Sequence, residues 1–125
     1  MIQVPLPNDV RLHLKSRTLE LIYDDGTFEL TAEYLRVHSP SAEVRGHGIG
    51  QETLQTGKKL VGIRSVQPSG NYALKIVFDD GHDSGLYTWE YLHDLAHNHA
   101  DYWQRYLTKL AESGGSRDGG LIARS

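Results

Sequence analysis

The stretch LKIVFDDGHDSGLYTWEYLHDL, residues 74–95, decides the fold. It opens with a strand pattern that ends at Asp79-Asp80-Gly81, where the glycine can take the positive φ that a hairpin turn requires. A shorter strand follows the turn, and Thr88 can cap a helix that begins at Trp89. The stretch therefore predicts a hairpin that leads directly into a helix.

A similar stretch, IYDDGTFELTAEYL, occurs earlier, at residues 22–35. Both copies contain an aromatic residue, Asp-Asp-Gly, a short strand and then Thr-x-Glu-Tyr-Leu. The second copy has two extra residues between the glycine and the threonine, and this longer connection begins with His82. Two interpretations stay open: an internal duplication, or the chance recurrence of a common hairpin pattern.

The size and composition predict one domain without metal–thiolate or disulfide chemistry of its own. The chain has 125 residues and no cysteine, which excludes disulfides, thiolate catalysis and any cysteine-based zinc or iron–sulfur site supplied by this chain alone. We expect an extended arm over residues 1–9, a single domain over 10–112 and a disordered, glycine-rich tail over 113–125.

Charge and hydropathy narrow the classes of partner. A formal net charge of -3 argues against a protein that binds nucleic acid through a basic face. No apolar run approaches the roughly 20 residues of a membrane span, and the first residues lack the layout of a signal peptide, so we expect a cytoplasmic protein without membrane contact. No feature of the sequence predicts an oligomeric state.

The pattern of strands and helices predicts an α+β fold. We expect an antiparallel sheet of about five or six strands built from hairpins, with one or two C-terminal helices packed on one face. The segment 42–58 is rich in glycine and is predicted to be a long loop, which in a compact domain is usually mobile or functional. The predicted strands are 10–15, 18–23, 27–30, 60–66, 71–78 and 82–87, and the predicted helices are 32–37, 89–96 and 100–112.

Residues 35–48, LRVHSPSAEVRGHG, together with DGHDS at 80–84 and WEYL at 89–92, resemble the N-terminal domain of γ-butyrobetaine hydroxylase, the DUF971 family. The resemblance covers about residues 8–112. In the hydroxylases a separate oxygenase domain carries out the iron- and 2-oxoglutarate-dependent oxidation, and the chain is too short to include one. The family domain is also fused to P-loop iron–sulfur carriers. The resemblance therefore implies a non-catalytic accessory or docking domain linked to iron or iron–sulfur proteins.

The family domain carries a zinc site of three cysteines and one histidine. Matched motif by motif, the cysteines fall on Ser39, on Ser41 and near Val44, and the histidine falls on His82. Neutral serine hydroxyls are poor zinc ligands beside thiolates. We therefore expect that the family's zinc site is not retained.

Seven histidines are the unusual feature of the composition. His82, His38 and His47 could approach one another and form a three-histidine site for zinc or iron. Alternatively, His82 makes a hydrogen bond across its hairpin and the other two face solvent. His93 and His97 lie four apart on a helix but lack the glutamate of a metalloprotease motif, so we interpret them as histidines that interact with the helix dipole.

The remaining charged residues allow a structural and a functional interpretation. The Asp-Asp-Gly segments are interpreted as turns rather than as paired catalytic carboxylates. Arg36 and Arg45, with the glycine-rich loop, could form a docking surface for a protein partner or an anionic group, or could belong to a solvated, mobile loop. The leading prediction is a protein-interaction domain, and the alternative is a small histidine-based metal-binding protein or metalloenzyme.

Overall fold

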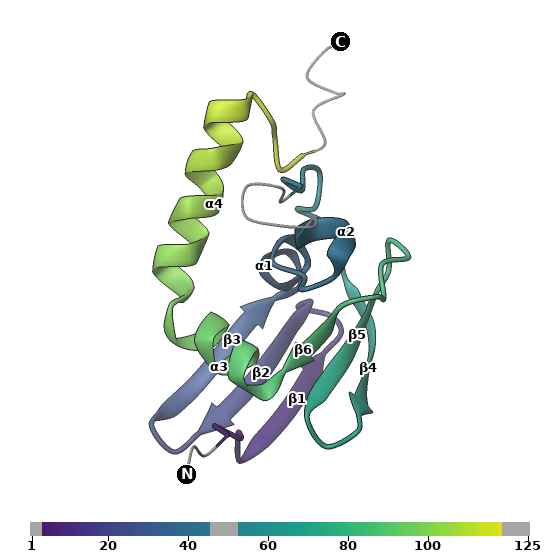
Figure 1. The fold of residues 1–125 in the computed structure, drawn as a ribbon, viewed down its shortest axis with the longest axis vertical. Helices are drawn as coiled ribbons and strands as arrows, with labels where there is room; N and C mark the ends of the chain where they lie inside the picture. The colour runs from purple at the N-terminus through teal and green to yellow at the C-terminus, as the bar shows by residue number, and fades with distance from the viewer. Residues whose placement is uncertain (1–3, 46–52, 119–125) are drawn as a thin grey trace.

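The computed structural model describes residues 4–45 and 53–118, apart from the side chains of Glu43 and Arg45. The chain runs through two successive groups of three strands, and each group leads into a helix (Figure 1). The first group contains β1 (Asp9–His13), β2 (Thr18–Tyr23), β3 (Gly26–Thr31) and α1 (Ala32–Val37), followed by the short α2 (Ala42–Arg45). The second contains β4 (Ile63–Ser69), β5 (Ala73–Phe78), β6 (Leu86–Thr88) and α3 (Trp89–His97), followed by α4 (His99–Ser113).

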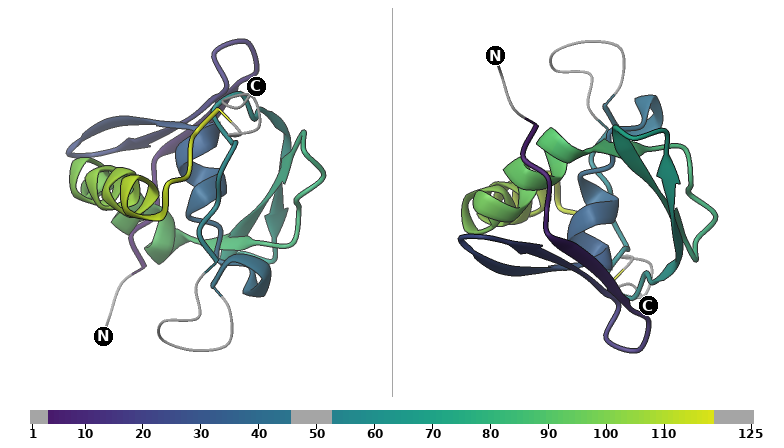
Figure 2. Two further views of the ribbon diagram at one scale, coloured as in Figure 1. Left: turned by 90° about the horizontal axis from the view of Figure 1, so that it is seen from above. Right: turned by 90° about the horizontal axis from the view of Figure 1, so that it is seen from below.

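The predicted α+β class, the six strands and the two C-terminal helices are confirmed, but the strands form two sheets instead of one. Each sheet is antiparallel, with the strand orders β1-β2-β3 and β4-β5-β6. Helix α1 lies between the two sheets (Figure 2), and all six of its residues are buried. Because a helix occupies the space between them, the two sheets cannot join through backbone hydrogen bonds.

The two hairpin-to-helix units have the same local construction. Thr31 caps α1 and Thr88 caps α3, and each side chain accepts a hydrogen bond from the backbone N–H three residues later. In each of the two helices, a tyrosine hydroxyl donates a hydrogen bond to a backbone carbonyl of the other unit. Tyr34 donates to the carbonyl of Leu95 at 2.7 Å, and Tyr91 donates to the carbonyl of His38 at 2.6 Å. The repeated pattern in the sequence therefore corresponds to a repeated structural unit.

The main core joins the inner faces of both sheets to α1 and α3. Its fully buried residues include Leu19 and Leu21 of β2, Ile76 of β5 and Leu92 of α3. A smaller apolar cluster attaches α4 to the end of α1 through Val37, Tyr106 and Leu110. Helix α4 therefore packs with its apolar stripe on the domain and leaves its other face in solvent.

The fourth strand begins later than the sequence predicts. Leu60 is 70% exposed, and the ladder with β5 starts at Ile63. Gly62 instead donates its backbone N–H to the carboxylate of Asp79 at 2.9 Å. The Asp79 N–H still bonds to the Gly62 carbonyl at 2.9 Å, but because the Asp79 side chain takes the place of a backbone acceptor here, the ladder does not continue toward Leu60.

Part of the predicted C-terminal tail packs on the domain. The guanidinium of Arg117 forms two hydrogen bonds of 2.7 Å with the carboxylate of Glu33, which is only 6% exposed. The backbone of residues 116–117 also accepts hydrogen bonds from Gly57 and Lys59. Glu33 lies in the buried helix α1, so a charge on it requires this partner. Residues 119–125 lie outside the described part.

No helix within the described ranges is long and apolar enough to cross a membrane.

Candidate functional site

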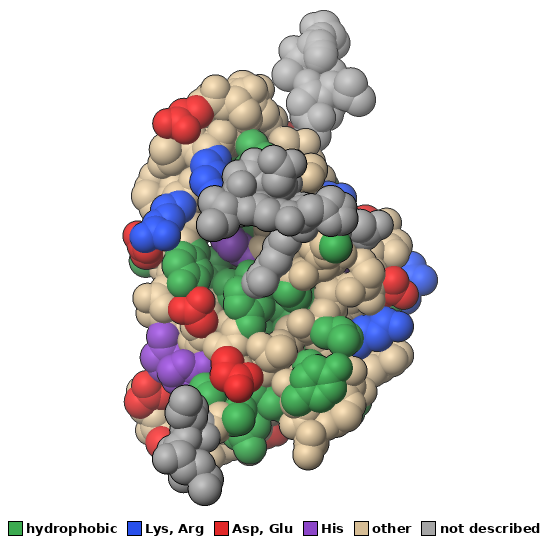
Figure 3. Space-filling model, viewed as in Figure 1, with side chains coloured by type: hydrophobic (Ala, Val, Ile, Leu, Met, Phe, Trp, Pro, Cys, Tyr) green, Lys and Arg blue, Asp and Glu red, His purple; other side chains and the backbone are tan. Residues whose placement is uncertain are grey.

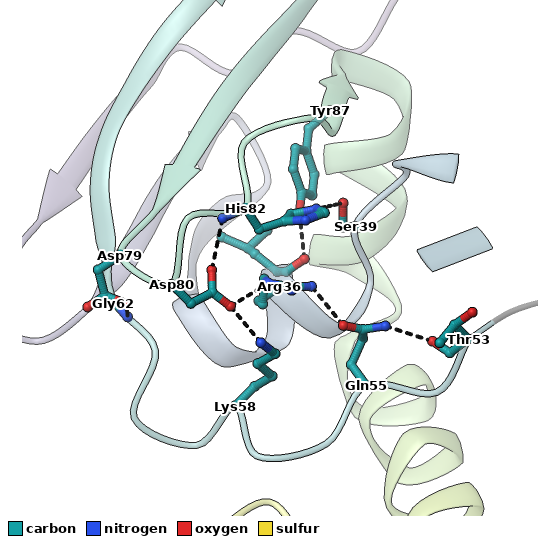
Figure 4. A network of polar contacts seen from close by, with 11 residues as sticks. Arg36, Ser39, Thr53, Gln55, Lys58, Gly62, Asp79, Asp80, His82 and Tyr87 are labelled. Atoms are coloured by element: carbon teal, nitrogen blue, oxygen red, sulfur yellow. Dashed lines mark hydrogen bonds and ion pairs between the residues drawn. The ribbon is translucent and has the colours of Figure 1, made fainter. Parts of the chain in front are cut away.

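A polar network joins the end of α1 to the turn between β5 and β6 (Figure 4). Arg36 is 7% exposed, and its Nε lies 2.9 Å from a carboxylate oxygen of Asp80. Another nitrogen of the same guanidinium donates to Gln55 at 3.0 Å, and Lys58 lies 2.6 Å from Asp80. Burial alone would raise the pKa of Asp80, but hydrogen bonds from Lys58, the His82 backbone and Arg36 outweigh it and lower that pKa to about 2.

A second set of polar contacts lies beside this network. His82 is 8% exposed, and its Nε2 lies 2.8 Å from the hydroxyl oxygen of Ser39. The same oxygen accepts the backbone N–H of Ser41 at 3.2 Å, and the hydroxyls of Ser41 and Ser84 are 2.8 Å apart. A Cβ on Gly85 would lie 2.5 Å from the Ser39 oxygen, so this approach of the two segments requires glycine. The end of α1 and the hairpin therefore meet closely at His82.

These residues occupy the positions that the family resemblance assigns to zinc ligands. The structure brings Ser39, Ser41 and His82 together, and Val44 lines the same small cavity as His82. However, two neutral hydroxyls and an isopropyl group cannot supply the negative charge of three thiolates, and Nε2 of His82 is engaged with Ser39. The residues present do not fit the family's zinc site. A hydrogen-bonded cluster takes its place.

The histidines proposed as a metal site have different surroundings. His38 bonds through Nδ1 to the carbonyl of Tyr34 at 2.8 Å and lines a cavity beside α4. His82 instead lines the small cavity near Asp80. His47 lies outside the described residues. The shared site of His38, His47 and His82 therefore stays a prediction.

The two arginines proposed for docking also differ. Arg36 is held inside the protein by Asp80 and Gln55, so its guanidinium is occupied by internal partners rather than presented to solvent. Arg45 lies in α2, and its side chain is not described. A docking role for Arg36 and Arg45 stays a prediction.

Sequence reasoning missed residues that only the fold brings together. Gln55 and Lys58 come from the predicted loop, and no local pattern marks them as partners of the Arg36–Asp80 pair. Among the described residues, one group has three metal-ligand atoms within 4.8 Å of one another: His13, Glu20 and Glu29. They share the outer face of the first sheet, and the alternation of side chains along strands was the signal that could have found them.

A cavity that the sequence did not predict lies next to the Arg36–Asp80 network. It has a volume of about 500 Å³ and opens between the end of α1, residues 53–55 and the helices α3 and α4. His38, Tyr91 and Tyr106 form part of its wall, and Arg105 and Lys109 of α4 also line it. Cavities of this size commonly hold small ligands.

Comparison with known proteins identifies a family and similar solved structures. The family model described as "Gamma-butyrobetaine hydroxylase-like, N-terminal" matches residues 10–93. The chain belongs to this family. A protein with a solution NMR structure shares 52% identity, with a TM-score of 0.83 over 93% of this chain and 92% of its own. A DUF971-family protein of unknown function from Acidithiobacillus ferrooxidans shares 37% identity, with a TM-score of 0.62 over 77% of this chain and 98% of its own. No curated protein matches the chain.

Proposed function

We propose that this γ-butyrobetaine hydroxylase-like domain is a non-catalytic accessory module that binds a protein partner, and that the partner is an iron or iron–sulfur protein. The observation that carries the proposal is that the polar groups at and beside the family's metal position bond to one another. Ser39 and His82 bond to each other, and Arg36, Asp80 and Lys58 form an internal ion-pair network. These groups hold two segments together. The iron link rests on the family resemblance.

The hollowed face beside this network is the surface we assign to the partner. It combines the end of α1, the segment 53–58 and the exposed edge of α4, and loops on rigid scaffolds commonly carry recognition. The segment is anchored at two positions, because Gln55 bonds to Arg36 and Lys58 bonds to Asp80. A fixed loop loses little conformational freedom on binding, which favours association.

Site-specific photo-crosslinking in cells tests this proposal. A photoreactive residue at Thr53, which is exposed on the proposed face, should give a discrete adduct with one partner. The matched control is Thr27, which is exposed on β3 of the first sheet and should not give that adduct. The partner isolated from the Thr53 adduct should contain iron by elemental analysis. The same adduct from both positions, or none from Thr53, would contradict the proposed face, and a partner without iron would contradict the iron link.

A second candidate function is metal binding through His82, His38 and His47. One observation favours it: burial lowers the pKa of His38, which keeps the imidazole in the neutral form that metal binding requires. Elemental analysis of protein purified without chelator separates the two candidates. This candidate predicts about one zinc or iron per chain in the wild type and its loss in His82→Ala, whereas the accessory module should contain no stoichiometric metal and keep its fold in chelator.

A further inference from the structure

Hydrogen bonds hold two of the aromatic side chains that line the cavity beside α4. Its apolar part includes Val37 and Leu54, and its aromatic part includes Tyr91 and Tyr106. The two tyrosine hydroxyls point to backbone carbonyls: Tyr91 donates to His38 at 2.6 Å and Tyr106 donates to Gln55 at 2.7 Å. The rings are therefore held in place and can offer their hydrocarbon surface to a bound molecule. Figure 3 shows hydrophobic side chains and a histidine on this face, beside the basic side chains of α4.

One edge of the cavity is cationic. Arg105 and Lys109 are four residues apart on α4, so they lie on the same side of the helix, and both line the cavity. Arg105 pairs with Asp101 at 2.9 Å, but both side chains are more than half exposed, so this pair is weak and easily exchanged. Lys109 makes no ion pair with any residue of the described ranges.

The acidic group on the wall is already satisfied. The hydroxyl of Tyr102 lies 2.9 Å from both carboxylate oxygens of Asp94 and shares its one hydrogen between them, and one of these oxygens also accepts the amide of Asn98 at 2.8 Å. These bonds connect α3 to α4. Asp94 therefore has a structural role, and the two cations on α4 are the charges with capacity for a new partner.

His38 adds a hydrogen-bond acceptor to the cavity. Its Nδ1 faces the carbonyl of Tyr34 at 2.8 Å, and a carbonyl can only accept, so Nδ1 carries the hydrogen. Burial lowers the pKa of His38 and so favours the neutral imidazole. The Nε2 atom of this tautomer carries a lone pair, which a ligand hydroxyl or N–H could use.

We propose that this cavity binds a small organic anion. Its carboxylate lies against Arg105 and Lys109, and its apolar or aromatic body lies between Leu54 and Tyr106. A hydrogen-bond donor on the body would reach Nε2 of His38. This inference goes beyond the proposed partner binding, although the cavity lies in the face assigned to the partner. It concerns a small molecule and rests on the charge, shape and hydrogen-bonding groups of the cavity, so it does not require that a protein partner binds.

An NMR titration of the full chain tests the proposal with three carboxylates as probes: phenylacetate, 4-phenylbutyrate and hexanoate. At least one should bind saturably and shift the backbone amide signals of the cavity residues. The corresponding primary amide has nearly the same shape without the charge, and should bind about tenfold more weakly, because a charge-assisted hydrogen bond contributes on this scale.

Two double variants with the same change in charge locate the site. Arg105→Gln with Lys109→Gln should weaken carboxylate binding about tenfold. Lys15→Gln with Arg64→Gln, exposed positions outside the cavity, should leave the affinity unchanged. Because all four side chains are exposed, both variants should fold, which their melting temperatures will verify. Equal binding of acid and amide, equal effects of the two double variants, or no saturable binding of any probe would overturn the proposal.

Discussion

The two hairpin-to-helix units have the same local construction, but the contacts that their turns make differ in burial and charge. In each unit the second aspartate of the Asp-Asp-Gly turn contacts the helix of the other unit: Asp25 bonds to His97 at 2.8 Å, and Asp80 bonds to Arg36 at 2.9 Å. The first contact is exposed and involves a group that titrates near neutral pH. The second joins a buried arginine and a partly buried carboxylate that Lys58 also contacts.

This difference follows from where the two helices lie. Helix α1 is buried along its whole length between the sheets, so its charged residues must have partners. Helix α3 buries only Leu92, Leu95 and Ala96, so its charged face stays in solvent. The second unit also has the longer turn that places His82 against Ser39. The buried Arg36–Asp80 ion pair and the family's metal position therefore lie at the same end of the molecule, where Asp80 and His82 meet the end of α1.

The largest expected effect comes from removing the carboxylate of the buried pair. Asp80→Ala leaves the Arg36 guanidinium without its anionic partner, and we expect a loss of about 3 kcal/mol in the free energy of unfolding. Urea denaturation followed by circular dichroism measures it. The matched variant at the equivalent turn is Asp25→Ala, whose exposed pair should contribute little. Equal losses in the two variants would show that the two turns are energetically alike.

The two reciprocal tyrosine contacts should also contribute unequally to the free energy of unfolding. Tyr34→Phe removes a hydroxyl that is fully buried and donates to Leu95, and we expect a loss of about 1 to 2 kcal/mol. Tyr91→Phe removes the equivalent bond to His38 from a partly buried ring, and we expect a loss of about 0.5 to 1 kcal/mol. Thermal unfolding of both variants provides the comparison. A larger loss in Tyr91→Phe would contradict the assignment of α1 as the central element.

Much of this plan could be predicted from the sequence. The turn glycines, the capping threonines and the hairpin patterns are local signals, and they predicted six strands, α1 and the break between α3 and α4 near Asn98, although β4 and β6 begin later than predicted. The division into two sheets could not be predicted, because it depends on α1 lying between them.

The site was predictable only where a family motif marked it. The motif brought Ser39, Ser41 and His82 to attention, and the structure places them in contact. No local signal indicated that Arg36 would be buried or that Gln55 and Lys58 would reach it. These contacts join residues 19 to 44 positions apart and arise from tertiary packing. The cavity beside α4 was missed for the same reason.

A smaller change is expected at the aromatic residue before each turn. Here a substitution should raise the free energy of unfolding, whereas the variants above lower it. The hydroxyl of Tyr23 is buried without a hydrogen-bond partner among the described residues, and the equivalent position in the second unit is Phe78. Burial, followed by the charge of Asp25, raises the pKa of Tyr23 to about 12. Tyr23→Phe should therefore be neutral or stabilising by up to about 1 kcal/mol, since it removes an unsatisfied polar atom.

The reverse substitution is the control for Tyr23→Phe. Phe78→Tyr places a hydroxyl in a position that is only 1% exposed, and it should destabilise the protein. Chemical denaturation measures both changes. A clear loss of stability in Tyr23→Phe would show that the hydroxyl has a bonding partner that the described residues do not include.

The smallest effect should be a dependence of stability on pH that only the first unit shows. Both ring nitrogens of His97 face acceptors, the carboxylate of Asp25 at 2.8 Å and the carbonyl of His93 at 2.9 Å, so the doubly protonated ring satisfies both. Burial alone would lower the pKa of His97, but these contacts outweigh it and raise the pKa above its ordinary value of 6.5. A raised folded-state pKa stabilises the protein fully below pH 6.5, and the contribution is lost as the pH rises through the folded-state pKa.

Melting temperatures of the wild type and His97→Gln, measured from pH 5 to 9, test this dependence. The difference between them should be greatest at the acidic end and should shrink as the pH rises. Asp25→Asn should remove most of this pH-dependent difference, because its neutral amide no longer favours the charged imidazole. The Arg36–Asp80 contact should show no such change over this range, since an arginine stays charged and the pKa of Asp80 is about 2. A difference that grows toward alkaline pH would mean that His97 is neutral in the folded protein, and the exposed and buried turns would then differ in burial but not in their response to pH.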